Sequence, residues 1–257
     1  MQITITNKSI THTATFAKQR YENHQTFLGD SLYAHCVAVA RQAEVIAQKL
    51  YQDIRKDYLP DSTKESISAI IQGALLHDVL NVSSCAFEHI AEVATVQIAA
   101  MVADISRDFR LVETKRDMEF RGRLSQSPVS AQIVIAADVI CTAKDLLRLV
   151  EKGGLPVLPK AKKILAQLDG DLLALHAANR YYVLRMYVHA ARNLLAEVSQ
   201  NIKACKHKAK MEKAIAQMTK SLRTKIAAKK AADTSEPVAP KKKGRSRGKR
   251  TAKKDSD

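Results

Sequence analysis

The segment from Ser66 to Leu80, SISAIIQGALLHDVL, is apolar almost all round and constrains the fold more than any other part of the sequence. A helix with one polar face packs at a surface, whereas a helix that is apolar on every face needs neighbours on most sides. We therefore expect this segment to form the central helix of a bundle.

Elsewhere the apolar residues recur at three-to-four spacing, which is typical of helices that bury one face. Pro60 predicts a helix end, Pro128 suits a first helical turn, and Gly153 and Gly154 predict another end. The expected helices cover residues 14–23, 31–56, 66–80, 86–104, 114–125, 128–151, 158–168 and 170–202. A lone alternating stretch at 2–6 is not stable as a strand, so the predicted fold class is all-α, a helical bundle.

The net charge of +16 is concentrated at the C-terminal end. Residues 203–257 hold 19 Lys and Arg against 5 Asp and Glu, whereas residues 1–202 hold 23 against 21. We expect an N-terminal segment 1–13, a helical domain 14–202, a basic amphipathic helix 203–232 and a disordered basic tail 233–257. The positive charge therefore concerns the partner of this appendage more than the substrate of the domain.

The cysteines Cys36, Cys85, Cys141 and Cys205 are far apart and form no CxxC pair. Cysteines without a disulfide-like spacing are typical of proteins in a reducing compartment, where disulfides are rare. The N-terminal residues show no basic stretch followed by an apolar run, and the roughly 18 uninterrupted apolar residues of a spanning helix occur nowhere. We expect a cytoplasmic protein that does not span a membrane.

His77 and Asp78 stand at the end of the predicted central helix, directly after GALL. An imidazole and a carboxylate at adjacent positions offer a mixed nitrogen and oxygen pair that suits Mn²⁺, Fe²⁺ or Mg²⁺. His35, in LYAHCVAVA, and Asp138, in IVIAADVI, lie in apolar runs, where a carboxylate needs a partner. The candidate metal site is His35, His77, Asp78 and Asp138, with Mn²⁺ as the expected ion and open positions for water and a substrate phosphate.

This order of residues resembles the HD superfamily, and more narrowly the (p)ppGpp hydrolase domain of the RelA/SpoT family and its small stand-alone relatives. FAKQRY, followed by Gly29, Tyr33 and His35, is similar to the first helix and ligand of that family, and GALLHDV resembles its AALLHDV. SPVSAQIVIAADVI, residues 127–140, is similar to the helix that supplies the last ligand. The resemblance covers about residues 14–150 and implies a metal-dependent phosphohydrolase that acts on a nucleotide, such as a guanosine 3′,5′-bis(diphosphate) 3′-pyrophosphohydrolase with a diverged substrate site.

The chain departs from the family pattern in three places. Where the family has an acidic pair that handles the attacking water, this chain has Asn81 and Val82. The Arg-Lys pair that helps to hold the nucleotide aligns with Thr26 and Phe27, and the Asn one turn beyond the last ligand aligns with Thr142. These positions predict that the substrate site differs from that of the family.

The candidate catalytic residues are Asp78 and Asn81, and Glu88 and His89 in the next helix are weighed as replacements, although a solvated helix face is the favoured interpretation for them. Arginine and lysine side chains near the site are candidates for holding substrate phosphates. They are Arg116, Arg123 and Lys144, together with Arg107, Arg110 and Arg121.

A second hypothesis is a non-catalytic HD scaffold that binds a nucleotide or metal, because Asn81 and Val82 remove the acidic pair. The alternative for the four candidate ligands is a purely structural role, in which they are buried residues that form salt bridges or cap helices. The tail favours contacts with the phosphate backbone of a nucleic acid, without base readout because aromatic residues are missing there. The candidate nucleic-acid contacts are Lys241, Lys242, Lys243, Arg245, Arg247, Lys249 and Arg250.

Overall fold

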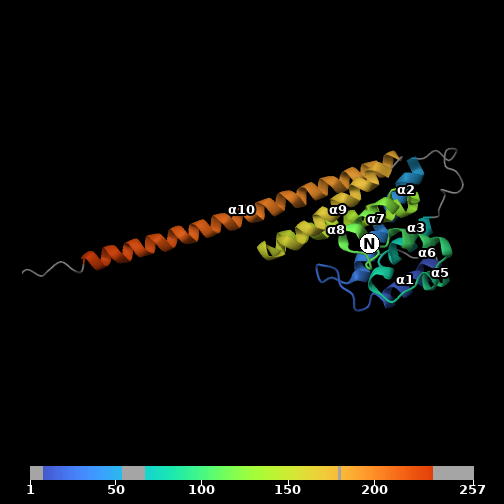
Figure 1. Ribbon diagram of the computed structural model, residues 1–257, viewed down its shortest axis with the longest axis horizontal. Coiled ribbons are helices and arrows are strands. Elements are labelled where there is room, and N and C mark those ends of the chain that lie inside the picture. Colours follow the sequence, from blue (N-terminus) through green and yellow to red (C-terminus); the bar gives the residue numbers. More distant parts are fainter. Residues whose placement is uncertain (1–7, 54–66, 179–180, 234–257) are drawn as a thin grey trace, which may run out of the picture. The chain divides into compact units, whose positions relative to one another are not determined.

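The computed structural model describes residues 8–53, 67–178 and 181–233, and these residues are predominantly helical (Figure 1). Within these ranges, β-structure is limited to one bridge between Gln25 and Ser31. The predicted all-α class is confirmed. The helices are α1 (Lys8–Arg20), α2 (Leu32–Asp53), α3 (Ile67–Leu76), α4 (Val79–Val82), α5 (Phe87–Val93), α6 (Val96–Ile105), α7 (Glu113–Leu124), α8 (Val129–Gly153), the 3-10 turn η3 (Leu155–Val157), α9 (Leu158–Ala178) and α10 (Tyr182–Asp233).

Helix α3 is the centre of the bundle. It packs against α1, α2, α6 and α8, and every residue from Ile70 to Leu76 is buried, which confirms the expectation for this apolar segment. Gly73 allows close packing on α6, because a Cβ atom at this position would lie 2.5 Å from Cε of Met101. The C-terminal end of α3, which leads directly into His77 and Asp78, is therefore held firmly inside the bundle.

The expected helix 86–104 is two helices, α5 and α6. Ala94 ends α5 with φ −120° and ψ −96°. Thr95 then caps α6, since its Oγ1 accepts a hydrogen bond from the backbone N–H of Ile98 at 3.2 Å. The first backbone N–H groups of a helix have no partner within the helix, and a threonine cap accepts a hydrogen bond from one of them. A new helix therefore begins at this threonine, although the apolar pattern continues through it and suggested a single helix.

Helix α9 continues through residues 169 and 170, where the sequence predicted a break between one helix ending at 168 and another beginning at 170. A Cβ atom at Gly170 would lie 2.3 Å from the guanidinium carbon of Arg121, so this glycine makes room for a side chain from α7. Arg121 there pairs with Asp171, with 3.1 Å between Nε and Oδ1. Other boundaries also differ from expectation. Helix α1 begins at Lys8, and Pro128 precedes α8 as its N-cap. The expected helix 170–202 is divided between α9, which ends at Ala178, and α10, which runs from Tyr182 to Asp233 and so continues through the boundary expected at residue 203.

The chain divides into two compact units, residues 1–208 and residues 209–257, and the division lies inside α10. The buried core lies in the first unit. In the described part of the second unit, α10 exposes its large apolar side chains, Met211, Ile215, Met218, Leu222 and Ile226. The expected tail, residues 233–257, lies outside the described residues apart from Asp233. None of the described helices has the length and apolarity needed to cross a bilayer.

The central position of α3 predicts a large cost for Ile70→Ala, because Ile70 is fully buried. We expect the free energy of unfolding of the first unit to fall by about 2–5 kcal/mol, the range for removing a buried aliphatic side chain. The matched control is Ile215→Ala, whose side chain is exposed and whose loss should change stability by less than about 0.5 kcal/mol. Urea unfolding followed by circular dichroism measures both, and equal effects would contradict the central role of α3.

Candidate metal centre

Four side chains from separate parts of the chain converge inside the first unit. His35 lies on α2, His77 follows α3, Asp78 is the N-cap of α4, and Asp138 lies on α8. His35 Nε2 is 3.1 Å from Asp138 Oδ1, and His77 Nε2 is 3.4 Å from Asp78 Oδ2 and 3.9 Å from Asp138 Oδ1. The structure therefore brings together all four predicted ligands.

The ring of His77 is oriented by its own helix end. Its Nδ1 lies 2.8 Å from the carbonyl oxygen of Ala74, and because a carbonyl only accepts hydrogen bonds, Nδ1 carries the proton. The opposite nitrogen, Nε2, is buried and makes no hydrogen bond, and it lies at ion-pair distance from the carboxylates of Asp78 and Asp138. An imidazole nitrogen and two carboxylates that face one another are donors that a metal ion can share, so this atom is a local indication that the site suits a cation.

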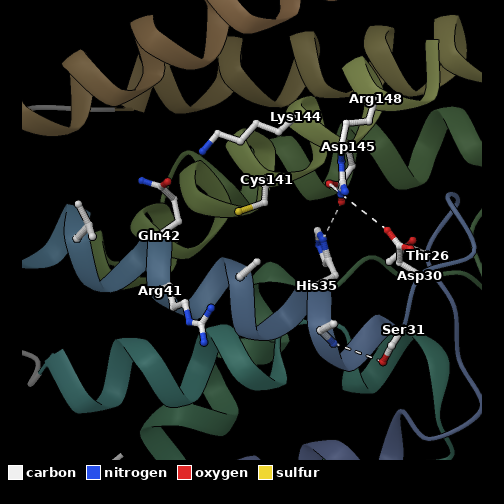
Figure 2. A pocket seen from close by; sticks show the side chains of 13 residues that line it. Thr26, Asp30, Ser31, His35, Arg41, Gln42, Cys141, Lys144, Asp145 and Arg148 are labelled. Atoms are coloured by element: carbon white, nitrogen blue, oxygen red, sulfur yellow. Dashed lines mark hydrogen bonds and ion pairs between the residues drawn. The ribbon is translucent and has the colours of Figure 1, made fainter. Parts of the chain in front are cut away.

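His35 is supported from behind by a carboxylate that the sequence analysis did not single out. Its Nδ1 is 3.5 Å from Oδ2 of Asp145 on α8, as Figure 2 shows from the side of the neighbouring cavity. Asp145 in turn pairs with Arg148 at 2.5 Å, and Arg148 is 3.7 Å from Asp30. A carboxylate behind a ligand histidine fixes its ring and leaves the far nitrogen for a metal. The spacing of seven residues from Asp138, two turns of one helix, is the signal that points to Asp145.

The charges of the cluster depend on one another. Burial lowers the pKa of His35, but the Asp138 and Asp145 carboxylates outweigh it and raise this pKa to about 10. Burial also lowers the pKa of His77, and Asp78 leads the opposing effects that raise it to about 10. Burial raises the pKa of Asp138, whereas the hydrogen bond from His35 and the two imidazolium charges lower it to about 2. Without a metal, the cluster is therefore a network of imidazolium and carboxylate groups.

The donor set fits a divalent metal ion. The ligand atoms of His35, His77 and Asp138 lie within 4.8 Å of one another, and so do those of Cys36, His77 and Asp78. Burial raises the pKa of the Cys36 thiol, which disfavours the thiolate form that binds metals. The remaining imidazole and carboxylate donors match an open, oxygen-rich and nitrogen-rich coordination sphere.

A cavity of about 370 Å³ opens onto all four ligands. Asn81 and Val82 line it at the positions of the missing acidic pair, and Thr142 lines it beside Asp138. The side-chain amide of Asn81 donates to Asp78 Oδ1 at 3.2 Å, while its own Oδ1 is buried without a partner. The hydroxyl of Thr142 donates to Asp138 Oδ1 at 3.0 Å. Both residues thus hold the carboxylates of the site in place.

The far wall of this cavity carries an arginine that is already paired. Arg107 lines the cavity, and its guanidinium lies 2.6 Å from Asp117 and 2.5 Å from Asp171. It also stacks on the ring of Phe120, with 4.1 Å between the guanidinium carbon and the ring centroid. Arg107 therefore links α7, through Asp117 and Phe120, to α9, through Asp171, and these contacts hold this wall of the cavity in place.

The candidate phosphate-binding residues lie in different places. Arg123 donates to the carbonyl oxygens of Ala103 and Ser106 at 3.0 and 2.7 Å and so closes the C-terminal end of α6. Arg116 lies on the ring of Phe109. Neither arginine lines the cavity at the four candidate ligands. The structure does not bring these two side chains to the metal cluster, because helix α7 turns them to other neighbours.

The other candidates in this part of the chain are also engaged in local contacts. Arg110 is 90% exposed and pairs with Asp108. The Nδ1 atom of His89 accepts a hydrogen bond from the backbone N–H of Ala86 at the start of α5. Glu88 lies in the first turn of α5 and does not line the cavity. The basic tail candidates, 241–250, lie outside the described residues.

Lys144 lines a second cavity, of about 770 Å³, between α2 and α8 (Figure 2). His35 and Thr26 line both cavities. His35 therefore faces the metal cluster with Nε2 and the wall of the second cavity with Nδ1.

Comparison with known proteins supports the fold. A scan against protein-family models finds no match, and no curated protein sequence matches the chain. Among solved structures, the chain is similar to one titled "A metazoan ortholog of SpoT hydrolyzes ppGpp and plays a role in starvation responses". The TM-score is 0.54 at 15% sequence identity, over 74% of this chain and 96% of the other. The likeness shows that the chain shares the fold of that structure.

The raised histidine pKa values predict that metal binding releases protons. Both imidazoles hold a proton at neutral pH in the metal-free protein, since their pKa values are about 10, and a metal binds only the neutral ring. We expect Mn²⁺ affinity to increase as the pH rises from 6 to 9, with release of up to two protons per ion. Calorimetry in two buffers of different ionisation enthalpy measures this release, and a buffer-independent enthalpy would refute the protonated state of the pair.

Proposed function

We propose that this chain is a metal-dependent phosphohydrolase that acts on a nucleotide, with guanosine 3′,5′-bis(diphosphate) as the first substrate to test and release of the 3′-pyrophosphate as the reaction. The observation that carries the proposal is the convergence of His35, His77, Asp78 and Asp138 around the buried Nε2 of His77, at a cavity. The fold, shared with a SpoT-like ppGpp hydrolase, supports the same conclusion.

In this proposal His35, His77, Asp78 and Asp138 hold one divalent ion, for which we expect Mn²⁺. Such an ion supplies two effects, the acidification of a water molecule and the neutralisation of phosphate charge. Asp145 orients His35, and Thr142 orients Asp138, through the contacts described above. The protein thereby fixes the donors before substrate binds, which is what accurate positioning of a phosphate requires.

Asp78 and Asn81 complete the catalytic side of the cavity. Water attacks the phosphorus next to the 3′-oxygen, and the bond between that phosphorus and the 3′-oxygen breaks. The proton of the water passes to a carboxylate, the oxygen of the water stays on the released pyrophosphate, and the 3′-oxygen takes up a proton from solvent to become a hydroxyl. Asn81 holds Asp78 through the amide hydrogen bond, and its unpartnered Oδ1 is available to accept a hydrogen bond from the attacking water. An amide orients a water molecule but cannot take its proton, so Asp78 is assigned the role of the base.

Replacing Asp78 by Asn tests this mechanism, because it preserves the size of the side chain and removes its charge. We expect kcat for pyrophosphate release in Mn²⁺ to fall about 100-fold or more, the scale of general-base catalysis. The control Asp169→Asn removes a charge from an exposed position of α9 and should leave kcat unchanged. Turnover that survives Asp78→Asn would sink the mechanism, and Mn²⁺ binding without turnover of any nucleotide would favour the scaffold alternative.

We also propose that the basic tail contacts the phosphate backbone of a nucleic acid. The support is the charge of residues 203–257, 19 Lys and Arg against 5 Asp and Glu, since clustered cations release counterions when they bind DNA or RNA. We expect the full chain to bind duplex DNA with a steep dependence on salt, and a chain that ends at residue 232 to bind more weakly with a shallower slope. Fluorescence anisotropy at several salt concentrations measures both, and equal binding by the two chains would remove this role.

A further inference from the structure

The cavity at the four candidate ligands is lined mostly by uncharged side chains. Apolar side chains of α2, α4, α6, α7, α8 and α9 line it, together with Phe27 and Phe109 from the connecting segments. The ring of Phe109 is 59% exposed and therefore offers an apolar surface to an occupant. Uncharged polar groups come from Gln25 and Gln167, among others. Walls of this kind suit an uncharged ring system with a few polar edges.

The charged side chains of the wall compensate one another. Among the described residues that line this cavity, only Arg107 and Asp171 carry a charge apart from the four candidate ligands. Arg107 pairs with Asp171 through Nη2 and with Asp117 through Nη1. The second carboxylate oxygen of Asp171, a buried residue, pairs with Arg121. Two arginines and two aspartates are thus matched, and this wall leaves no cation free for a substrate.

The ligand cluster offers a partner to one anionic group only. The two negative charges of Asp78 and Asp138 balance a divalent ion, so the cavity as a whole is close to neutral when the cluster holds one. A phosphate group that binds the ion directly has its partner there. A further phosphate group in the same cavity would be a charge without a partner among apolar side chains, which is costly.

We propose that this cavity selects nucleotides whose phosphate groups all stand at the reacting position and whose remaining part is uncharged. The inference rests on the proposed function and narrows its substrate class. A nucleoside 3′-diphosphate matches the cavity better than a nucleoside that carries diphosphates at both the 3′ and the 5′ position. The apolar walls contact the base and the sugar, and Gln25 and Gln167 form hydrogen bonds with their polar edges.

The first experiment compares guanosine 3′-diphosphate with guanosine 3′,5′-bis(diphosphate). Both compounds present the same reacting group, and they differ only in the 5′-diphosphate. We expect kcat/KM of the Mn²⁺-loaded chain to be about tenfold or more higher for guanosine 3′-diphosphate, because a buried charge without a partner costs at least that factor. An equal kcat/KM for the two compounds, or a higher value for the bis(diphosphate), would overturn the inference.

A cation added to the cavity should reduce this preference. Gln167→Lys places an ammonium group on the α9 wall, and Ala166→Lys is the matched control, because it adds the same charge at an exposed neighbouring position that does not line the cavity. We expect Gln167→Lys to raise kcat/KM for the bis(diphosphate) about tenfold relative to guanosine 3′-diphosphate, the scale of one charge-assisted contact. The control should leave the ratio within about twofold, since an exposed charge is screened. An equal change in both variants, or no change in either, contradicts selection by the cavity.

A binding measurement separates this inference from the proposed function. If the Mn²⁺-loaded chain turns over neither compound, the proposed reaction fails, and calorimetric titration of the same chain with both compounds still tests the cavity. An affinity about tenfold or more higher for guanosine 3′-diphosphate supports the selection, provided that the difference shrinks in Gln167→Lys and not in Ala166→Lys. Equal or tighter binding of the bis(diphosphate), a difference that Gln167→Lys leaves unchanged, or binding of neither compound rejects it.

Discussion

The hydrogen bond between His77 Nδ1 and the carbonyl of Ala74 links the fold to the site. It forms because α3 ends inside a bundle whose four neighbouring helices hold that end in place. Once Nδ1 is committed to its own backbone, the only free position of the ring is Nε2, which is buried and faces two carboxylates. The apolar character of α3 thus determines where this cluster lies and which nitrogen of the His77 ring faces it.

The remaining contacts of the site act on the same principle. Asp145 supports His35, Thr142 supports Asp138, and Asn81 supports Asp78, each through a separate side-chain contact. Two of these supporting residues, Asn81 and Thr142, stand where the family resemblance predicts other side chains. The four candidate ligands therefore match the pattern of the resemblance, whereas the residues that support them differ from it.

The helical class and the convergence of the four candidate ligands could be predicted because each has a strong local pattern. The apolar segment 66–80 predicted the central helix, and His77-Asp78 at its end predicted where the cluster lies. The break at Thr95 and the continuity of α9 through Gly170 could not be predicted from periodicity, because a cap and the packing of Arg121 decide them. Likewise the charged stretch around α7 suggested phosphate contacts, yet Arg123 binds the end of α6. Periodicity alone does not tell which neighbour an arginine on a charged helix will meet.

The most direct test of the central claim is anomalous scattering at the manganese absorption edge from crystals grown with Mn²⁺. The account predicts one strong peak per chain within bonding distance of His35 Nε2, His77 Nε2 and a carboxylate oxygen of each of Asp78 and Asp138. The same crystals of a His77→Ala variant should lose the peak. A peak elsewhere in the chain, or none at this cluster in ordered crystals, would contradict the assignment of the metal centre.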